Sequence, residues 1–222
     1  GGDADLAELE RQEKAAQQSY LEAARKLTAA RRKSADKLSR EITAAMQTLA
    51  MQGGKFEVAL LPLDQNDGNS GNAHGLESIE FQVSANPGTP LRSLAKVASG
   101  GELSRISLAI QVATSQLAGA PTLIFDEVDS GIGGRVAEIV GHLLKKLGKT
   151  YQVLCVTHLP QVAAAADQQW QVSKAVENGV TLSHIAVLDG ERRIEEIARM
   201  LGGVKITETT RKHAAEMLGV AA

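Results

Sequence analysis

The stretch covering residues 3–52 contains neither glycine nor proline, the two residues that most often interrupt a helix. Glycine pairs stand on both sides of it, at positions 1–2 and 53–54. This composition predicts one continuous long helix, and it divides the chain into a helical segment, 1–52, and a folded domain, 53–222.

Apolar and small residues recur along this helix in alternating steps of three and four, the spacing of a coiled coil. They are Leu6, Leu9, Glu13, Ala16, Tyr20, Ala23, Leu27, Ala30 and Ser34, followed after one extra step of four by Leu38, Ile42, Ala45 and Leu49. Glu13 and Ser34 weaken this seam locally. No other segment of the chain has a matching length, so we expect the partner helix in another segment or another molecule. The alternative is a surface helix packed on its own domain, which the length disfavours.

The remaining residues alternate between strand-like and helix-like patterns. Strands are expected at 56–61 and 78–83, as an antiparallel pair around the polar loop 64–72, and at 122–125, 153–156, 168–173 and 180–188. Helices are expected from Ser99 and at 134–147, 159–166, 193–201 and 207–218. Alternation in the middle with antiparallel strands at the edges predicts an α/β domain with a mixed sheet and flanking helices.

Composition excludes several function classes. The 24 Lys and Arg against 26 Asp and Glu give a formal net charge of -2, so no global basic field indicates nucleic acid. Aromatic residues make up 3%, too few for base-stacking platforms. The single cysteine, Cys155, fits a reducing cytoplasm, and no signal peptide or membrane-spanning run is found. The densest basic cluster is Arg31, Arg32, Lys33, Lys37 and Arg40; a solvated helix face is favoured there over contact with DNA phosphates.

Two adjacent acids follow the short apolar run 122–125, at the place where a buried parallel strand ends at a ligand crevice. Asp126 is suited to hold Mg²⁺, directly or through water, and Glu127 to orient a water that attacks a γ-phosphate. The alternative is a pair of solvated acids that begin a turn.

A helix with unusual first residues begins at or just after Ser99. Gly100 and Gly101 in its first turn lower helix propensity, which is explained if a phosphate approaches the backbone amides closely. In that case a side chain at Gly101 should obstruct the phosphate and leave the fold intact. Ser99 and Glu102 also fit a capping box that needs no ligand. The expected apolar face is Leu103, Ile106, Ile110, Ala113 and Leu117.

A histidine, His158, follows the apolar strand 153–156. At the lip of a strand beside the acid pair it can donate a hydrogen bond to a phosphate oxygen. A turn or cap role is the alternative for a lone histidine.

The order of these pieces carries a family resemblance, over residues 96–105, 125–134 and 155–163. Ser99-Gly100-Gly101-Glu102 resembles the signature loop of ABC-type ATPases, the strand ending in Asp126 and Glu127 resembles their Walker B strand, and His158 their switch histidine. More narrowly, the chain is similar to the SMC-like members that act in bacterial DNA repair.

The resemblance implies a function and a set of roles. ATP and Mg²⁺ would be the cofactors, with Asp126 at the metal, Glu127 and His158 catalytic, and residues 99–102 binding nucleotide from a second head. Two heads would form an ATP-dependent homodimer that engages DNA during double-strand break repair and recombination, in the bacterial cytoplasm at the nucleoid. A nucleotide-binding subunit of a transporter is an alternative, which the long helix disfavours.

The chain departs from the family pattern in two ways. The D-loop aspartate falls on Gly133, which leaves Asp129 and Ser130 as stand-ins for nucleotide binding. No GxxxxGKS/T phosphate loop occurs; the ending at 148–150 lacks its first glycine, because position 143 is Leu143. The chain therefore resembles the C-terminal half of a head, whose N-terminal half would be a partner. Alone it is expected to be inactive, or to act as a noncatalytic dimerisation or interaction module.

Overall fold

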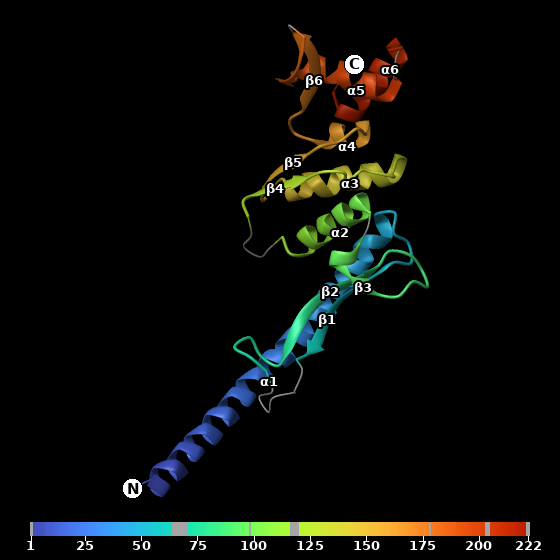
Figure 1. The fold of residues 1–222 in the computed structure, drawn as a ribbon. Helices are drawn as coiled ribbons and strands as arrows, with labels where there is room; N and C mark the ends of the chain where they lie inside the picture. Colours follow the sequence, from blue (N-terminus) through green and yellow to red (C-terminus); the bar gives the residue numbers. More distant parts are fainter. Residues whose placement is uncertain are drawn as a thin grey trace. The chain divides into compact units, whose positions relative to one another are not determined.

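The computed structural model describes residues 2–63, 71–97, 99–115, 120–177, 179–202 and 205–220. Residues 64–70 of the polar loop lie outside these ranges, and so does Leu117 of the predicted apolar helix face. Ala98, just before the signature residues 99–102, and Asn178, between the strands expected at 168–173 and 180–188, also lie outside them. The chain forms two compact units, one made of residues 1–44 and 53–96 and the other of 45–52 and 97–222 (Figure 1). Residues 53–96, which were expected to belong to the folded domain 53–222, thus cluster with the long helix.

Helix α1 (Gly2–Thr48) confirms the predicted long helix, although it ends before residue 52. Ala50 adopts the left-handed region at φ 60°, and the Met51 amide donates to the Met46 carbonyl at 3.3 Å. This left-handed residue with a backward bond terminates the helix without a glycine. Sequence signals for helix ends favour glycine at such a position, so the predicted end at residue 52, just before Gly53, was late.

The first unit places an antiparallel sheet on part of α1. Strands β1 (Lys55–Pro62), β2 (Glu77–Ser84) and β3 (Arg92–Ser93) pair in that order, and the 3-10 turn η1 (Leu94–Lys96) follows. Phe56 lies opposite Val83, and both are buried. The predicted antiparallel pair is therefore confirmed, while β3 and η1 had no sequence signal.

Side chains of α1 complete the outer edge of β1. The Phe56 amide donates to the Thr43 hydroxyl at 2.9 Å, and the Val58 amide donates to the Ser39 hydroxyl at 2.9 Å. Unpaired amides of an edge strand would otherwise need water or another chain. The helix is thus joined to the sheet by hydrogen bonds as well as by apolar packing.

The second unit contains a parallel strand pair. Helix α2 (Gly100–Ala113) precedes strand β4 (Thr122–Phe125), helix α3 (Gly134–Leu147), strand β5 (Gln152–Cys155) and helix α4 (Pro160–Ala165). Strands β4 and β5 are parallel, with Phe125 opposite Cys155, so their carboxyl ends reach the same edge. A Cβ on Gly141 of α3 would lie 2.9 Å from that of Ala165, which shows how closely α3 and α4 approach. This edge is where the predicted site residues were expected.

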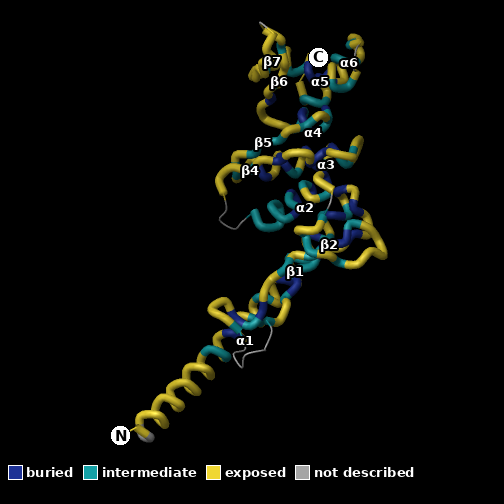
Figure 2. Tube along the Cα trace, in the orientation of Figure 1, coloured by how far each residue is buried: buried dark blue, intermediate teal, exposed yellow. Residues whose placement is uncertain are grey.

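The chain continues with a hairpin and two helices. Strands β6 (Trp170–Glu177) and β7 (Val180–Val187) form a separate antiparallel pair, and helices α5 (Gly190–Gly202) and α6 (Glu208–Leu218) pack together and on α4. Their shared core consists of Ala163, Ile197, Ala198 and Ala214. Figure 2 shows the hairpin and the first turns of α1 as exposed.

The predicted fold class, α/β with flanking helices and a long N-terminal helix, is confirmed. The predicted apolar face of α2 needs correction, because Leu103 is exposed while Arg105, Leu108 and Ala109 are buried with Ile106. Gly101 packs closely against Ser130, so the buried face of α2 is the one that carries Gly101, Arg105 and Leu108. Across the described ranges, no helix combines the length and apolar character needed to cross a lipid bilayer.

Candidate nucleotide site

The acid pair lies at the carboxyl end of β4, as predicted. Phe125 is buried, Asp126 and Glu127 are exposed, and Val128 is buried again, so the acids stand on a short exposed bend between two anchors. The Asp126 carboxylate accepts the Glu127 amide at 2.9 Å. Glu127 has φ 57°, a left-handed conformation that costs free energy for a residue with a side chain. Strained residues of this kind cluster at functional sites, which supports a role for this bend.

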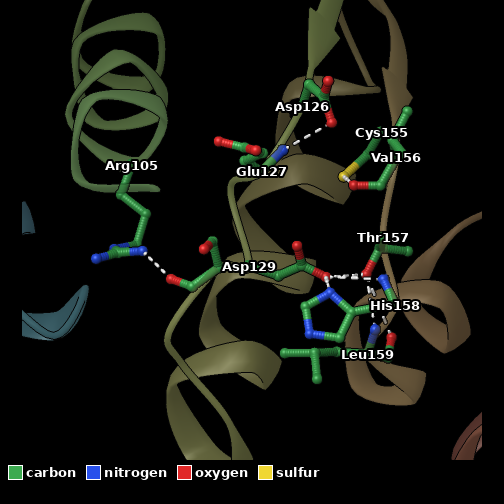
Figure 3. Close-up of polar contacts among 10 residues, drawn as sticks. Arg105, Asp126, Glu127, Asp129, Cys155, Val156, Thr157, His158 and Leu159 are labelled. Carbon is green, nitrogen blue, oxygen red and sulfur yellow. Dashed lines mark hydrogen bonds and ion pairs between the residues drawn. The ribbon is translucent and has the colours of Figure 1, made fainter. Parts of the chain in front are cut away.

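The loop after β5 lies beside this bend, and Asp129 joins the two (Figure 3). The Asp129 carboxylate accepts hydrogen bonds from the Thr157 hydroxyl and, at 3.1 Å, from the His158 amide. The His158 Nδ1 atom lies 3.4 Å from the same oxygen. The structure therefore brings His158 to the acid pair, as predicted, through a buried carboxylate.

The N-terminus of α2 has the predicted cap. The Ser99 hydroxyl accepts the Glu102 amide at 3.3 Å, while no return bond from the Glu102 side chain is seen in the described residues. A Cβ added at Gly100 would lie 2.4 Å from a carboxylate oxygen of Glu127. The α2 N-terminus and the proposed catalytic acid are thus neighbours within one chain.

Glycine is required at position 101 for a structural reason that the sequence did not show. A Cβ there would lie 2.9 Å from the Ser130 carbonyl oxygen and 3.0 Å from the Ser130 Cβ. The expectation that a side chain at Gly101 leaves the fold intact is therefore wrong, because the first turn of α2 packs directly on the bend that follows β4. Ser130 itself stays a predicted nucleotide-binding residue.

Two further residues of α2 fasten the bend, and the periodicity of the helix gave no sign of either. The Ser104 hydroxyl donates to the Asp126 carbonyl at 2.7 Å. Buried Arg105 donates to the Ser130 carbonyl at 2.8 Å and to the Leu49 carbonyl at 3.1 Å. Burial lowers the pKa of Arg105, and the negative charge of Glu102 opposes this shift. An arginine on the inner face of a helix is a signal that a search for apolar periodicity discards.

The bend after β4 and the loop after β5 surround one open pocket of about 290 Å³. It is lined by Asp126, Glu127, Asp129, Ser130, Val156, Thr157 and His158. Three carboxylates would repel a bare phosphate, so a phosphate bound here requires a cation such as Mg²⁺. Within the described residues no three His, Cys, Asp or Glu side chains are grouped to hold a metal. A single carboxylate of the acid pair, completed by waters and phosphate oxygens, is a ligand set that suits Mg²⁺.

Cys155 lies at the end of β5 near this pocket. Burial and, to a smaller extent, the charges of Asp129 and Asp126 raise the pKa of its thiol to about 12. A thiol with so high a pKa is a poor nucleophile at neutral pH. Cys155 is therefore given no chemical role in this site.

The fold is that of SMC head domains. It superposes on the Smc head domain with a coiled coil and joint from Pyrococcus yayanosii with a TM-score of 0.58 and 18% sequence identity, covering 88% of this chain and 35% of that chain. The family model of the RecF/RecN/SMC N terminal domain matches residues 7–181. The chain belongs to this family.

Relatives with higher sequence identity are DNA repair proteins. The chain is 46% identical over 216 residues to the DNA repair protein RecN of Xylella fastidiosa strain 9a5c, covering 97% of this chain and 38% of that protein. It is 48% identical over 201 residues to the DNA repair protein RecN of Vibrio cholerae serotype O1, covering 90% of this chain and 36% of that protein. The chain thus spans little more than a third of the length of these relatives.

Proposed function

We propose that this chain is the C-terminal half of the ATPase head of an SMC-like protein that acts in DNA double-strand break repair. The observation that carries the proposal is the convergence of the acid pair and His158 on one pocket, with the α2 N-terminus beside Glu127. The relatives named as DNA repair proteins support the biological setting.

Each residue of the pocket has a proposed role. ATP with Mg²⁺ would supply the phosphoryl group and the charge that neutralises the leaving oxygens. Asp126 would hold the metal, Glu127 would orient the attacking water, and His158 would hydrogen-bond that water. Residues 99–102 would receive the nucleotide of a second head at the α2 N-terminus, so that ATP joins two heads and hydrolysis releases them.

The phosphate-binding loop would come from an N-terminal half of the same head. No GxxxxGKS/T sequence occurs in these 222 residues, and the chain spans 36–38% of the relatives quoted above. Ile124 of β4 and Val156 after β5 are 71% and 63% exposed, unusual values for apolar residues beside buried parallel strands. If the rest of a head buries this surface, the exposure of both apolar residues in this chain is explained.

The exposed seam of α1 would pair with a second helix and transmit the ATP cycle to DNA. Leu6, Leu9 and Leu27 lie on this seam and are exposed. Arg31 from the basic cluster is bound to Glu77, and Lys37 lies 3.9 Å from a carboxylate oxygen of Glu41. Arg32, Lys33 and Arg40 are therefore the cations of this cluster proposed to meet DNA phosphates. A cytoplasmic, nucleoid-associated location follows from this role.

Glu127→Gln tests the catalytic assignment in the complete protein. The variant should bind ATP normally, hydrolyse it about two to four orders of magnitude more slowly, and accumulate as an ATP-bound head dimer. Steady-state turnover and size analysis with ATP are the measurements. Turnover at the wild-type rate would show that the acid pair is structural.

The signature can be tested with a matched pair of caps. Ser99 caps α2, and Thr207 caps α6 by accepting the Thr210 amide at 3.2 Å. Loss of either cap should cost about 0.5 to 2 kcal/mol of stability. Only Ser99→Ala should also reduce ATP-dependent head dimerisation, whereas equal behaviour of Ser99→Ala and Thr207→Ala would leave capping as the whole role of Ser99.

The absence of the phosphate loop favours a second function for the isolated chain, a noncatalytic dimerisation or interaction module. Nucleotide titration separates the two. The isolated chain should show neither micromolar ATP affinity nor turnover, and the N-terminal half should restore both. Failure of restoration would favour the noncatalytic module.

A further inference from the structure

Asp129 is the most deeply buried acid in the described part of the chain. Its side chain is 3% exposed, although it belongs to a bend whose neighbours Glu127 and Ser130 are exposed. A buried carboxylate is stable only if it is neutralised by an opposite charge or by hydrogen bonds to the charged form. The identity of its partners therefore indicates what the residue does.

The other buried acids each have an arginine. Glu77 pairs with Arg31 at 3.1 Å, and Glu196 pairs with Arg199 at 2.7 Å. Within the described ranges no lysine or arginine pairs with Asp129; its ion-pair partner is the imidazole of His158. The hydroxyl of Thr157 and the amide of His158 donate to the same carboxylate oxygen, Oδ2.

This arrangement controls the imidazole. A neutral histidine carries its proton on one ring nitrogen, and a hydrogen bond from that nitrogen decides which one. A carboxylate facing Nδ1 favours the form with hydrogen on Nδ1, which leaves Nε2 as an acceptor. His158 is 69% exposed and lines the pocket, so Nε2 is available to accept a hydrogen bond from a group such as the attacking water. In this neutral form it does not donate to a phosphate oxygen, the contact expected from the sequence.

We propose that Asp129 is a positioning residue that holds the Nδ1–H form of His158 and fixes the loop after β5 to the acid-pair bend. It acts through the imidazole and need not touch the nucleotide, in contrast to the nucleotide contact expected from the sequence. Only the catalytic consequence of this assignment rests on the proposed ATPase function; the protonation state of His158 does not.

The direct test is nitrogen-15 NMR of the histidine rings in the 222-residue chain, at a pH where the imidazoles are neutral. The chain has five histidines, and the signal lost in His158→Gln identifies the one in question. We expect wild-type His158 to carry its proton on Nδ1. A proton on Nε2 in the wild-type chain would overturn the proposal without any further variant at Asp129.

Two variants separate the acceptor facing Nδ1 from the other hydrogen bonds to it. Asp129→Leu has a similar shape but removes the oxygen that faces Nδ1. It should shift the neutral ring towards the Nε2–H form. Thr157→Val is the matched control, because it removes one donor to Oδ2, keeps the carboxylate, and should leave the ring form unchanged. An unchanged ring in Asp129→Leu would contradict the assignment.

A double-mutant cycle in the complete protein tests the catalytic consequence. Asp129→Leu should lower kcat for ATP by about 10- to 100-fold and leave KM nearly unchanged. Added to His158→Gln it should lower kcat no further, since both changes act on one imidazole. Additive losses would overturn the proposal. A complete wild-type protein without turnover would instead refute the proposed function, and the NMR result would still decide the role of Asp129.

Discussion

Two hairpins of equal strand length have opposite surroundings in this chain. Strands β1 and β2 carry buried Phe56, Ala59 and Val83, and α1 bonds to the edge of β1. Strands β6 and β7 have no buried residue along their described lengths. Both consist of antiparallel strands with a regular register, so local pairing alone does not account for the difference.

The second hairpin carries most of its large apolar residues on one face, with Val180 and Leu182 on the other. Paired residues of antiparallel strands share a face, and alternate residues along a strand return to it. One face therefore carries Trp170, Val172, Val176, Ile185 and Val187, all exposed. Exposed apolar residues grouped on one face in this way are typical of an interaction surface. The first hairpin is thus covered by α1 of this chain, whereas the apolar face of the second is exposed among the described residues.

The largest effect is expected at Phe56, which is 0% exposed. Phe56→Ala should cost about 3 to 5 kcal/mol of stability in the first unit, because it leaves a cavity between α1 and the sheet. Hydrogen exchange of the β1 amides measures this unit separately.

Val172→Ala on the exposed hairpin is the matched change. It should alter the free energy of unfolding of the isolated chain by less than about 0.5 kcal/mol. A loss as large as that of Phe56→Ala would show that the second hairpin already has a cover in this chain and would end the comparison.

A smaller effect is expected from the ion pair that joins α1 to β2. Arg31 donates to buried Glu77 at 3.1 Å, and Thr28 donates to it at 2.7 Å. Arg31→Ala should cost about 1 to 3 kcal/mol, because the carboxylate stays buried with one donor fewer. Arg32→Ala, the change of an exposed neighbouring cation, should stay within about 0.5 kcal/mol. Equal stability of the two variants would mean that Glu77 contributes nothing to joining helix and sheet.

Elements with local start and stop signals were predicted well from the sequence. Strand β4 and helix α3 have the predicted bounds, since Pro121 precedes the one and Gly148 follows the other. The end of α1 was missed because Ala50 is held in a left-handed conformation that the sequence pattern does not favour. Strand β3 is only two residues long and exists through its pairing with β2, which no local pattern reports.

The site shows the same division. The acid pair, His158 and the Ser99 cap were predicted because each stands at the end of a recognisable element. The roles of Arg105 and Thr157, and the packing of Gly101 on Ser130, depend on contacts between segments distant in sequence. Such contacts have no periodicity, so a single sequence does not reveal them.

Trp170 provides the sharpest test of the uncovered hairpin. Because Trp170 serves only as a probe, this test should change the stability of the chain least. It is the single tryptophan of the chain, it is 54% exposed, and it lies on the apolar face of β6 and β7. When the N-terminal half is added, Trp170 should lose contact with water, because burial of aromatic surface drives such associations. Incorporating 5-fluorotryptophan into this chain before mixing keeps its fluorine NMR signal distinct from that of any tryptophan in the added half. The signal should shift on mixing and lose its sensitivity to solvent exchange between H₂O and D₂O.

Val172→Ser, on the same face, should weaken this association, whereas Ser173→Ala on the opposite face should not. Restored ATP turnover with an unchanged Trp170 signal would mean that the added half binds elsewhere and that the exposed face of this hairpin serves another partner.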